Sequence, residues 1–166
     1  MISKKMQDEL NAQINAEIYS AYLYLAMDAY FQSENLGGFG NWMTVQAQEE
    51  MAHAMKIYGF VNECGGRVTL DAIDKPTGTW KSPLAVFENV YKHEQKVTGL
   101  INGLVELAAR EKDHATGIFL QWFVTEQVEE EKNANDIVST LQKMKDIPQA
   151  LYMLDKELGQ RKMGGD

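Results

Sequence analysis

Carboxylates and an imidazole stand in the middle of a stretch that otherwise has the pattern of a buried helix. The stretch VQAQEEMAHAM, residues 45–55, contains no glycine or proline and is rich in helix-forming residues. Steps of three and four residues place Glu50 and His53 on one face of this helix, between the apolar Met43 and Ile57. Glutamate oxygens and imidazole nitrogens on one face are suitable ligands for a transition metal ion. The pattern therefore predicts a metal site inside a helical core.

A carboxylate also stands near the middle of the apolar stripe in three further helical segments. These residues are Glu17, Glu94 and Glu130. A buried carboxylate costs on the order of several kcal/mol unless it is paired or binds a metal ion. Four carboxylates and a histidine are most simply held together by shared cations. Because the set is rich in oxygen and contains no thiolate cluster, it suits iron or manganese better than structural zinc.

Four long helices and a short fifth helix must position these side chains. Helix-breaking residues and the spacing of the apolar residues predict four long helices, at 3–34, 39–64, 84–112 and 114–145, and a short helix after Pro148. Short turns join the first two helices and the next two, so each pair is an antiparallel hairpin. The connection 65–83 is long enough to run the length of a helix. We therefore predict an all-α four-helix bundle with one long crossover and a short C-terminal helix, in a single domain over residues 1–166.

The composition narrows the classes of function. The formal net charge of −8 argues against nucleic-acid binding, which requires a basic face. Cys64 is the only cysteine, so no disulfide within the chain is possible. The amino terminus lacks an apolar signal region, and no run is long enough to span a membrane. We expect a cytoplasmic protein with no nucleic-acid or membrane partner.

Five stretches together resemble non-haem bacterial ferritin over nearly the whole chain. They are NAEIYSAYLYL, QAQEEMAHAMKIY, YKHEQKVT, FLQWFVTEQVEEE and LYMLDKELGQR. The resemblance implies a ferroxidase centre that binds two iron ions. Its first site would consist of Glu17, Glu50 and His53. Its second site would consist of Glu50, Glu94 and Glu130, with Gln127 close to the bridging oxygen species.

The resemblance also implies a third iron site nearby. It would combine Glu130 with three further carboxylates, Glu49, Glu126 and Glu129. By pattern alone, these three belong to charge-rich helical stretches, which are usually solvated. Their assignment as ligands therefore depends on the resemblance.

Two aromatic residues match positions that supply electrons to oxygen in this family. Tyr24 lies two turns from Glu17 on the same stripe, whereas packing is the default interpretation of Trp122. His93 and His114 lie off the core stripes. We expect His93 on the surface and His114 at the start of a helix.

The activity that the resemblance implies is iron storage. Two ferrous ions would be oxidised by dioxygen or hydrogen peroxide, and the ferric product would mineralise inside a hollow shell of 24 copies of the chain. The partners expected are thus ferrous iron, the oxidant and further copies of the chain. The last helix would line the fourfold axis of the shell, where apolar Leu151, Leu154 and Leu158 suit packing.

The chain departs from the symmetrical di-iron pattern, in which Glu-x-x-His occurs on two helices. Gln127 and Glu130 stand where the second such motif would be. This difference argues against bacterioferritin and makes the two iron sites unequal. Met51 stands where bacterioferritin has its haem-ligating methionine, but non-haem ferritins also carry methionine there. We expect no haem.

Two other functions remain open from the sequence. A discrete di-iron oxygenase or peroxidase would use the same ligands, but it would need a substrate pocket or an electron-donor partner. A purely structural bundle would use the polar layer to fix the register of its helices. That interpretation leaves the central carboxylates without compensation.

Overall fold

The computed structural model describes residues 2–145 and 147–164, and their regular structure is entirely helical. The five helices are α1 (Lys4–Ser33), α2 (Gly37–Glu63), α3 (Pro83–Glu111), α4 (His114–Lys143) and α5 (Pro148–Leu158). These bounds lie within two residues of the predicted bounds of the four long helices. The predicted all-α bundle with a short C-terminal helix is confirmed. No helix in the described part of the chain has both the length and the apolar content needed to cross a membrane.

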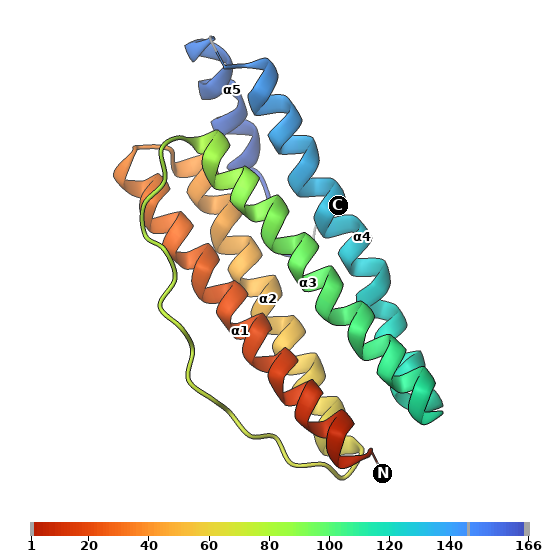
Figure 1. Ribbon diagram of the computed structural model, residues 1–166. Coiled ribbons are helices and arrows are strands. Elements are labelled where there is room, and N and C mark those ends of the chain that lie inside the picture. The colour runs from red at the N-terminus through yellow and green to blue at the C-terminus, as the bar shows by residue number, and fades with distance from the viewer. Residues whose placement is uncertain (1, 146, 165–166) are drawn as a thin grey trace.

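The four long helices form two hairpins, α1 with α2 and α3 with α4 (Figure 1). The chain between α2 and α3 contains no helix or strand and runs along the side of α1 from one end of the bundle to the other. Polar side chains one helical turn apart hold it there. Asn11 Nδ2 donates to the Arg67 carbonyl at 3.1 Å, and Asn15 Nδ2 donates to the Ala72 carbonyl at 3.0 Å. The crossover therefore covers one face of α1 and makes the two hairpins parts of one bundle.

Capping side chains define where α1 and α4 begin. Ser3 Oγ accepts from Met6 N at 2.9 Å, and Asp113 Oδ1 accepts from Thr116 N at 3.0 Å. Such caps satisfy amide groups that lack a partner in the first turn of a helix. Lys112 takes the left-handed conformation, with φ of 56°, and so reverses the chain between α3 and α4.

The apolar core has two halves, one toward each end of the bundle. One half contains Tyr24, Phe31, Phe39 and Phe87, together with other residues of all four long helices and α5. The other half contains Leu10, Ile57, Ile101 and Phe123. Buried polar side chains separate the two halves, so the predicted pattern of apolar ends and a polar centre is confirmed.

Helix α5 packs across the beginning of α2. Asp155 Oδ1 accepts from Gly38 N at 2.8 Å and from Phe39 N at 3.1 Å, which caps α2 with a residue from a distant part of the chain. Leu154 and Leu158 are buried in the core of the bundle itself.

The position of α5 at a fourfold axis stays a prediction, but its leucines already pack within the chain. Leu154 and Leu158 are buried in their own subunit's core, and Leu151 packs against that core, because α5 folds back onto α2. The side chains that α5 presents to the outside include Tyr152 and Met153.

Alanine substitutions at two neighbouring glycines test the packing of α5 on α2. A Cβ atom at Gly38 would lie 1.6 Å from the Asp155 carbonyl oxygen, whereas a Cβ at Gly37 would meet nothing within 4 Å. Gly38→Ala should lower the free energy of unfolding by about 1–3 kcal/mol, because α5 must move away from α2. The matched control Gly37→Ala should keep or slightly raise stability, since alanine favours helix. Urea unfolding of both variants measures the difference, and equal stabilities would contradict the docking of α5.

Candidate metal centre

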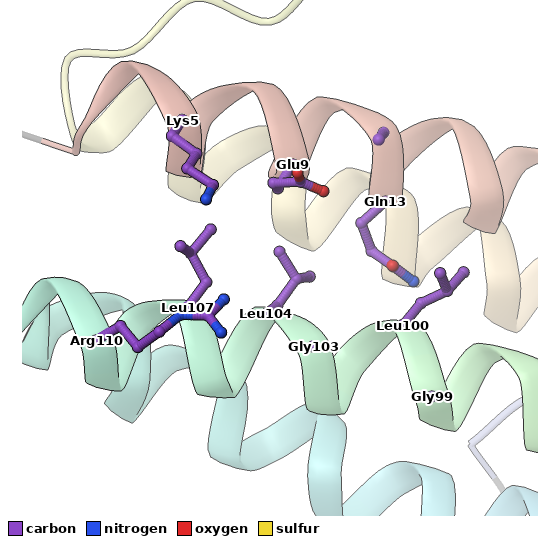
Figure 2. Close-up of a pocket in the computed structure, with 10 residues that line it drawn as sticks. Lys5, Glu9, Gln13, Gly99, Leu100, Gly103, Leu104, Leu107 and Arg110 are labelled. Atoms are coloured by element: carbon purple, nitrogen blue, oxygen red, sulfur yellow. The ribbon is translucent and has the colours of Figure 1, made fainter.

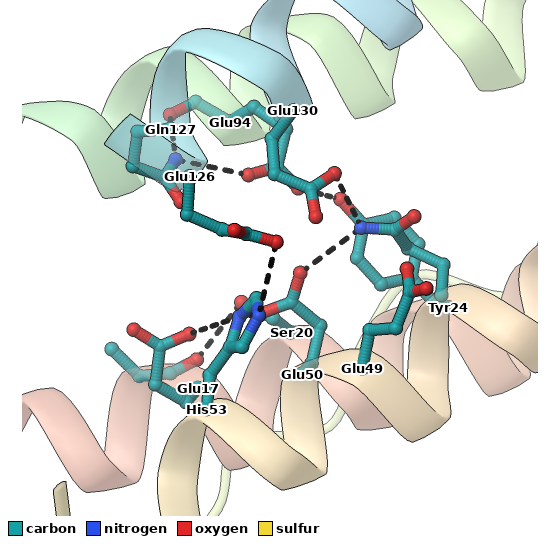
Figure 3. Close-up of polar contacts among 12 residues, drawn as sticks. Glu17, Ser20, Tyr24, Glu49, Glu50, His53, Glu94, Glu126, Gln127 and Glu130 are labelled. Atoms are coloured by element: carbon teal, nitrogen blue, oxygen red, sulfur yellow. Dashed lines mark hydrogen bonds and ion pairs between the residues drawn. The ribbon is translucent and has the colours of Figure 1, made fainter. Parts of the chain in front are cut away.

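All four long helices contribute side chains to one buried polar layer in the middle of the bundle (Figure 3). Each of the following residues is at most 5% exposed: Glu17, Gln46, Glu50, His53, Glu94, Gln127 and Glu130. Their spacing along each helix follows the three-and-four steps of a core stripe, so each side chain points inward. The five residues first picked from these stripes, Glu17, Glu50, His53, Glu94 and Glu130, are thus all buried.

The tightest ligand group is formed by Glu17, Glu50 and His53. One ligand atom from each lies within 4.8 Å of the others. His53 Nδ1 is 3.5 Å from Glu50 Oε2 and 4.0 Å from Glu17 Oε2. Glu17 Oε2 is buried and accepts no hydrogen bond from the residues that the structure describes. A buried carboxylate oxygen without a donor, facing an imidazole and a second carboxylate, is suited to receive a cation.

A second group lies on the other side of the imidazole and is formed by His53, Glu126 and Glu130. Its ligand atoms also lie within 4.8 Å of one another, and His53 Nε2 is 3.7 Å from Glu126 Oε1. Figure 3 shows Glu126 reaching from α4 toward His53 on α2. Glu126 was assigned to a third iron site, but here it contacts a residue of the first.

Glu50, Glu94 and Glu130 were expected to form the second iron site. In the described part of the chain, they do not bring three ligand atoms within 4.8 Å of one another. The reason lies in the hydrogen bonds of Glu94. The Tyr24 hydroxyl donates to Glu94 Oε1, and Gln127 Nε2 donates to Glu94 Oε2 at 3.2 Å. These two donors hold the Glu94 carboxylate between α1 and α4. The role of Glu94 as an iron ligand stays a prediction.

Both candidate aromatic residues touch this polar layer. Tyr24 is completely buried, and its hydroxyl donates to the Glu94 carboxylate. Trp122 is 39% exposed, and the other side of its ring packs edge-on against the core residue Phe123, with centroids 4.9 Å apart. The Trp122 ring lies edge-on to His53, with centroids 5.3 Å apart, and Lys56 Nζ lies 4.0 Å from its centroid.

The remaining third-site candidates differ in their surroundings. Glu49 is partly buried and pairs with Arg161, whose Nη2 is 2.6 Å from Glu49 Oε2. Glu129 is exposed on α4. Both nonetheless lie near enough to Glu126 for their charges to raise its pKa, although burial of Glu126 is the larger cause. Glu126 is thus the one of these three carboxylates that lies beside His53, and the charges of Glu49 and Glu129 act on it.

Two glutamines were missed as members of the site. Gln46 Nε2 donates to Glu130 Oε2 at 2.7 Å and to Glu50 Oε1 at 3.2 Å, which links α2 to α4 through two candidate ligands. Gln13 Nε2 donates to Glu17 Oε1 at 2.7 Å. Each glutamine precedes its carboxylate by four residues, a spacing at which helical side chains meet. That spacing is the signal by which the sequence could have identified both residues.

The expected surface position of His93 is wrong. The His93 ring is partly buried, because α1 packs against this part of α3. Its Nε2 lies 2.8 Å from Ser20 Oγ, and its ring lies edge-on to Tyr24, with centroids 6.1 Å apart. His114 begins α4, as predicted.

A pocket between α1 and α3 approaches the polar layer from outside (Figure 2). It has a volume of about 300 Å³, and Gln13 lies in its wall. Gly99 and Gly103 leave open space on the α3 side, since a Cβ atom at either position would meet nothing within 4 Å. Gln13 also donates to Glu17, so the pocket is separated from a candidate ligand by one side chain.

Burial dominates the electrostatics of the four central carboxylates. It raises the pKa of Glu94 to about 7 and that of Glu130 to about 8. It also raises the pKa values of Glu17 and Glu50 well above the usual range, and repulsion between neighbouring carboxylates adds to the rise. The layer therefore retains protons near neutral pH that a bound cation must displace.

Comparison with known proteins gives one family. The family described as "Ferritin-like domain" matches residues 7–144. A bacterial non-heme ferritin of Bacteroides fragilis is 47% identical over 162 residues, which are 97% of this chain and 100% of that protein. A bacterial non-heme ferritin of Staphylococcus aureus is 40% identical over 161 residues, which are 97% of each chain. An open-pore ferritin of the archaeon Archaeoglobus fulgidus, known from crystal structures, has a TM-score of 0.96 and 59% identity over 97% of this chain and 98% of that one.

The raised pKa values predict that cation binding releases protons. Glu94 and Glu130 are largely protonated at about pH 6 and largely ionised at about pH 9, because their pKa values are about 7 and about 8. Anaerobic addition of ferrous ion should thus release more protons per ion at the lower pH. A pH-stat titration measures this number. Glu130→Gln, which removes one titrating group, should release fewer protons, and equal release at both pH values would contradict the prediction.

Proposed function

Because the chain belongs to the ferritin family, we propose that it oxidises ferrous ions inside the bundle and stores the ferric product. One observation carries the proposal. Glu17, Glu50 and His53 bring three ligand atoms within 4.8 Å of one another in a buried layer, and one Glu17 oxygen there has no hydrogen-bond donor among the described residues. A layer built only to fix helix register would satisfy that oxygen.

Two ferrous ions are the proposed substrates of the centre. The first binds Glu17, Glu50 and His53, and the second binds Glu130, Glu94 and the shared Glu50. Gln46, which donates to both Glu50 and Glu130, fixes the distance between these carboxylates. Anionic oxygen ligands stabilise ferric iron more than ferrous iron, so this layer favours oxidation. Gln127 orients Glu94 through the hydrogen bond from its side-chain amide.

The oxidation requires an acceptor for two electrons. Two ferrous ions supply them, and dioxygen with two protons becomes hydrogen peroxide, or hydrogen peroxide with two protons becomes two water molecules. The Tyr24 hydroxyl donates to Glu94 and so orients that carboxylate toward the centre. Trp122 reaches the centre from the surface side, against His53.

Storage requires a third position and an enclosed space. We propose that Glu126, Glu49 and Glu129, with Glu130, form a third iron site, through which iron passes between the centre and the mineral. The enclosed space that we propose is a shell of 24 copies of the chain, in the cytoplasm. Large apolar side chains that are exposed on the single chain support assembly, because other copies would cover them. They include Leu25, Met51, Met55, Ile118 and Val128.

Aerobic iron loading tests the proposal. Wild-type protein should turn ferrous salt into ferric product rapidly and, after desalting, retain far more than two iron ions per chain in a peak of shell size. Glu50→Ala should lower the initial oxidation rate by at least about tenfold, because Glu50 is shared by both iron sites. The matched control Glu106→Ala removes an exposed carboxylate of α3 and should keep the wild-type rate. Absorbance of the ferric product and iron per chain give the two readouts.

Other outcomes of the same experiment identify other functions. Rapid oxidation with about two iron ions retained per chain would indicate a discrete di-iron oxygenase or peroxidase. A Glu50→Ala variant that oxidises iron at the wild-type rate would show that the proposed centre is wrong.

A further inference from the structure

The C-terminal segment reaches the edge of the polar layer through Arg161. This residue follows α5, and its Nη2 donates to Glu49 Oε2 at 2.6 Å. The two side chains are 18% and 21% exposed, so the ion pair is largely shielded from water. Such shielding makes the pair stronger than one on an open surface.

Several contacts fix Arg161 in this place. Its guanidinium lies 4.3 Å from the centroid of the Trp42 ring, and its Nη1 donates to the Trp42 carbonyl at 3.3 Å. The side-chain amide of Asn41 donates to the carbonyls of Arg161, at 3.0 Å, and of Leu158, at 3.2 Å. Both the side chain and the backbone of Arg161 are thus held by the part of α2 that precedes Glu49.

The carboxylate that Arg161 engages belongs to the proposed third iron site. Glu49 and Glu129 both act electrostatically on Glu126, which contacts His53. In Figure 3, Glu49 lies apart from His53 and Glu126. A cation beside Glu126 would draw the Glu49 carboxylate toward itself. Arg161, whose guanidinium lies over the Trp42 ring, opposes that movement through its ion pair with Glu49.

We propose that Arg161 competes with iron for Glu49 and thereby weakens the third iron site. This inference rests on the proposed function of that site. A ferrous ion that binds Glu49 through Oε2 must replace the guanidinium, and one that binds through the other oxygen must pull against the ion pair. The first iron position is formed by Glu17, Glu50 and His53 and shares no ligand with the third, so its affinity should not depend on Arg161. Arg161 is a positioning residue, and its effect is to keep the third ion easily exchanged.

Anaerobic titration of the assembled, full-length protein with ferrous ion tests the competition. Wild type should bind two ions tightly and a third more weakly. Arg161→Gln should bind the third ion about tenfold more tightly and leave the affinity of the first ion unchanged, because the competing charge is gone. Arg161→Lys keeps the charge and should behave like wild type. Arg161→Met, whose chain still covers Trp42, provides the uncharged variant if Arg161→Gln does not assemble.

A double-mutant comparison separates competition from a structural effect. In a Glu49→Gln background, the third ion should be lost or weak, and removing Arg161 should have no further effect. The proposal is wrong if the uncharged variants leave the affinity of the third ion unchanged or lower it. It is also wrong if the gain persists without Glu49. Failure of the first two ions to bind wild-type protein would instead contradict the proposed ferroxidase centre.

Discussion

The burial of four carboxylates in one layer is the constraint on which the rest of the structure depends. Glu17, Glu50, Glu94 and Glu130 share one layer, and burial raises the pKa of each. Bound protons and amide N–H donors offset part of the cost of burying these carboxylates. Bound cations offset more of that cost. The apolar halves of the core on either side supply the stability that this layer lacks. The same raised pKa values couple cation binding to proton release.

The outer elements keep the four ligand-bearing helices at matching heights. Asn11 and Asn15 fix the crossover along α1. The crossover thereby leads the chain back so that α3 packs beside α1. Helix α5 returns to the start of α2, where Asp155 caps the helix that carries Glu50 and His53. Arg161 continues this return as far as Glu49. The C-terminal segment therefore connects the end of the bundle to the edge of the metal centre.

Helical period accounts for what the sequence could predict. A residue's face is fixed by its position in a regular helix, so the inward direction of Glu17, Glu50 and His53 follows from spacing alone. Contacts that depend on how the helices pack against one another could not be predicted from the sequence. His93 was placed on the surface because nothing in α3 indicates that Ser20 of α1 would lie against it. The ion pair of Arg161 was missed for the same reason, since it depends on the path of the chain after α5.

X-ray diffraction from crystals soaked anaerobically in ferrous salt, recorded at the iron absorption edge, tests the central claim most directly. The claim is that the buried carboxylate layer is a dinuclear iron site. Two anomalous peaks should appear in each subunit, one between Glu17, Glu50 and His53, and the other beside Glu130 and Glu94, with Glu50 touching both. An absence of iron peaks between the helices, with the carboxylates unmoved, would show that the layer is structural and would contradict the account.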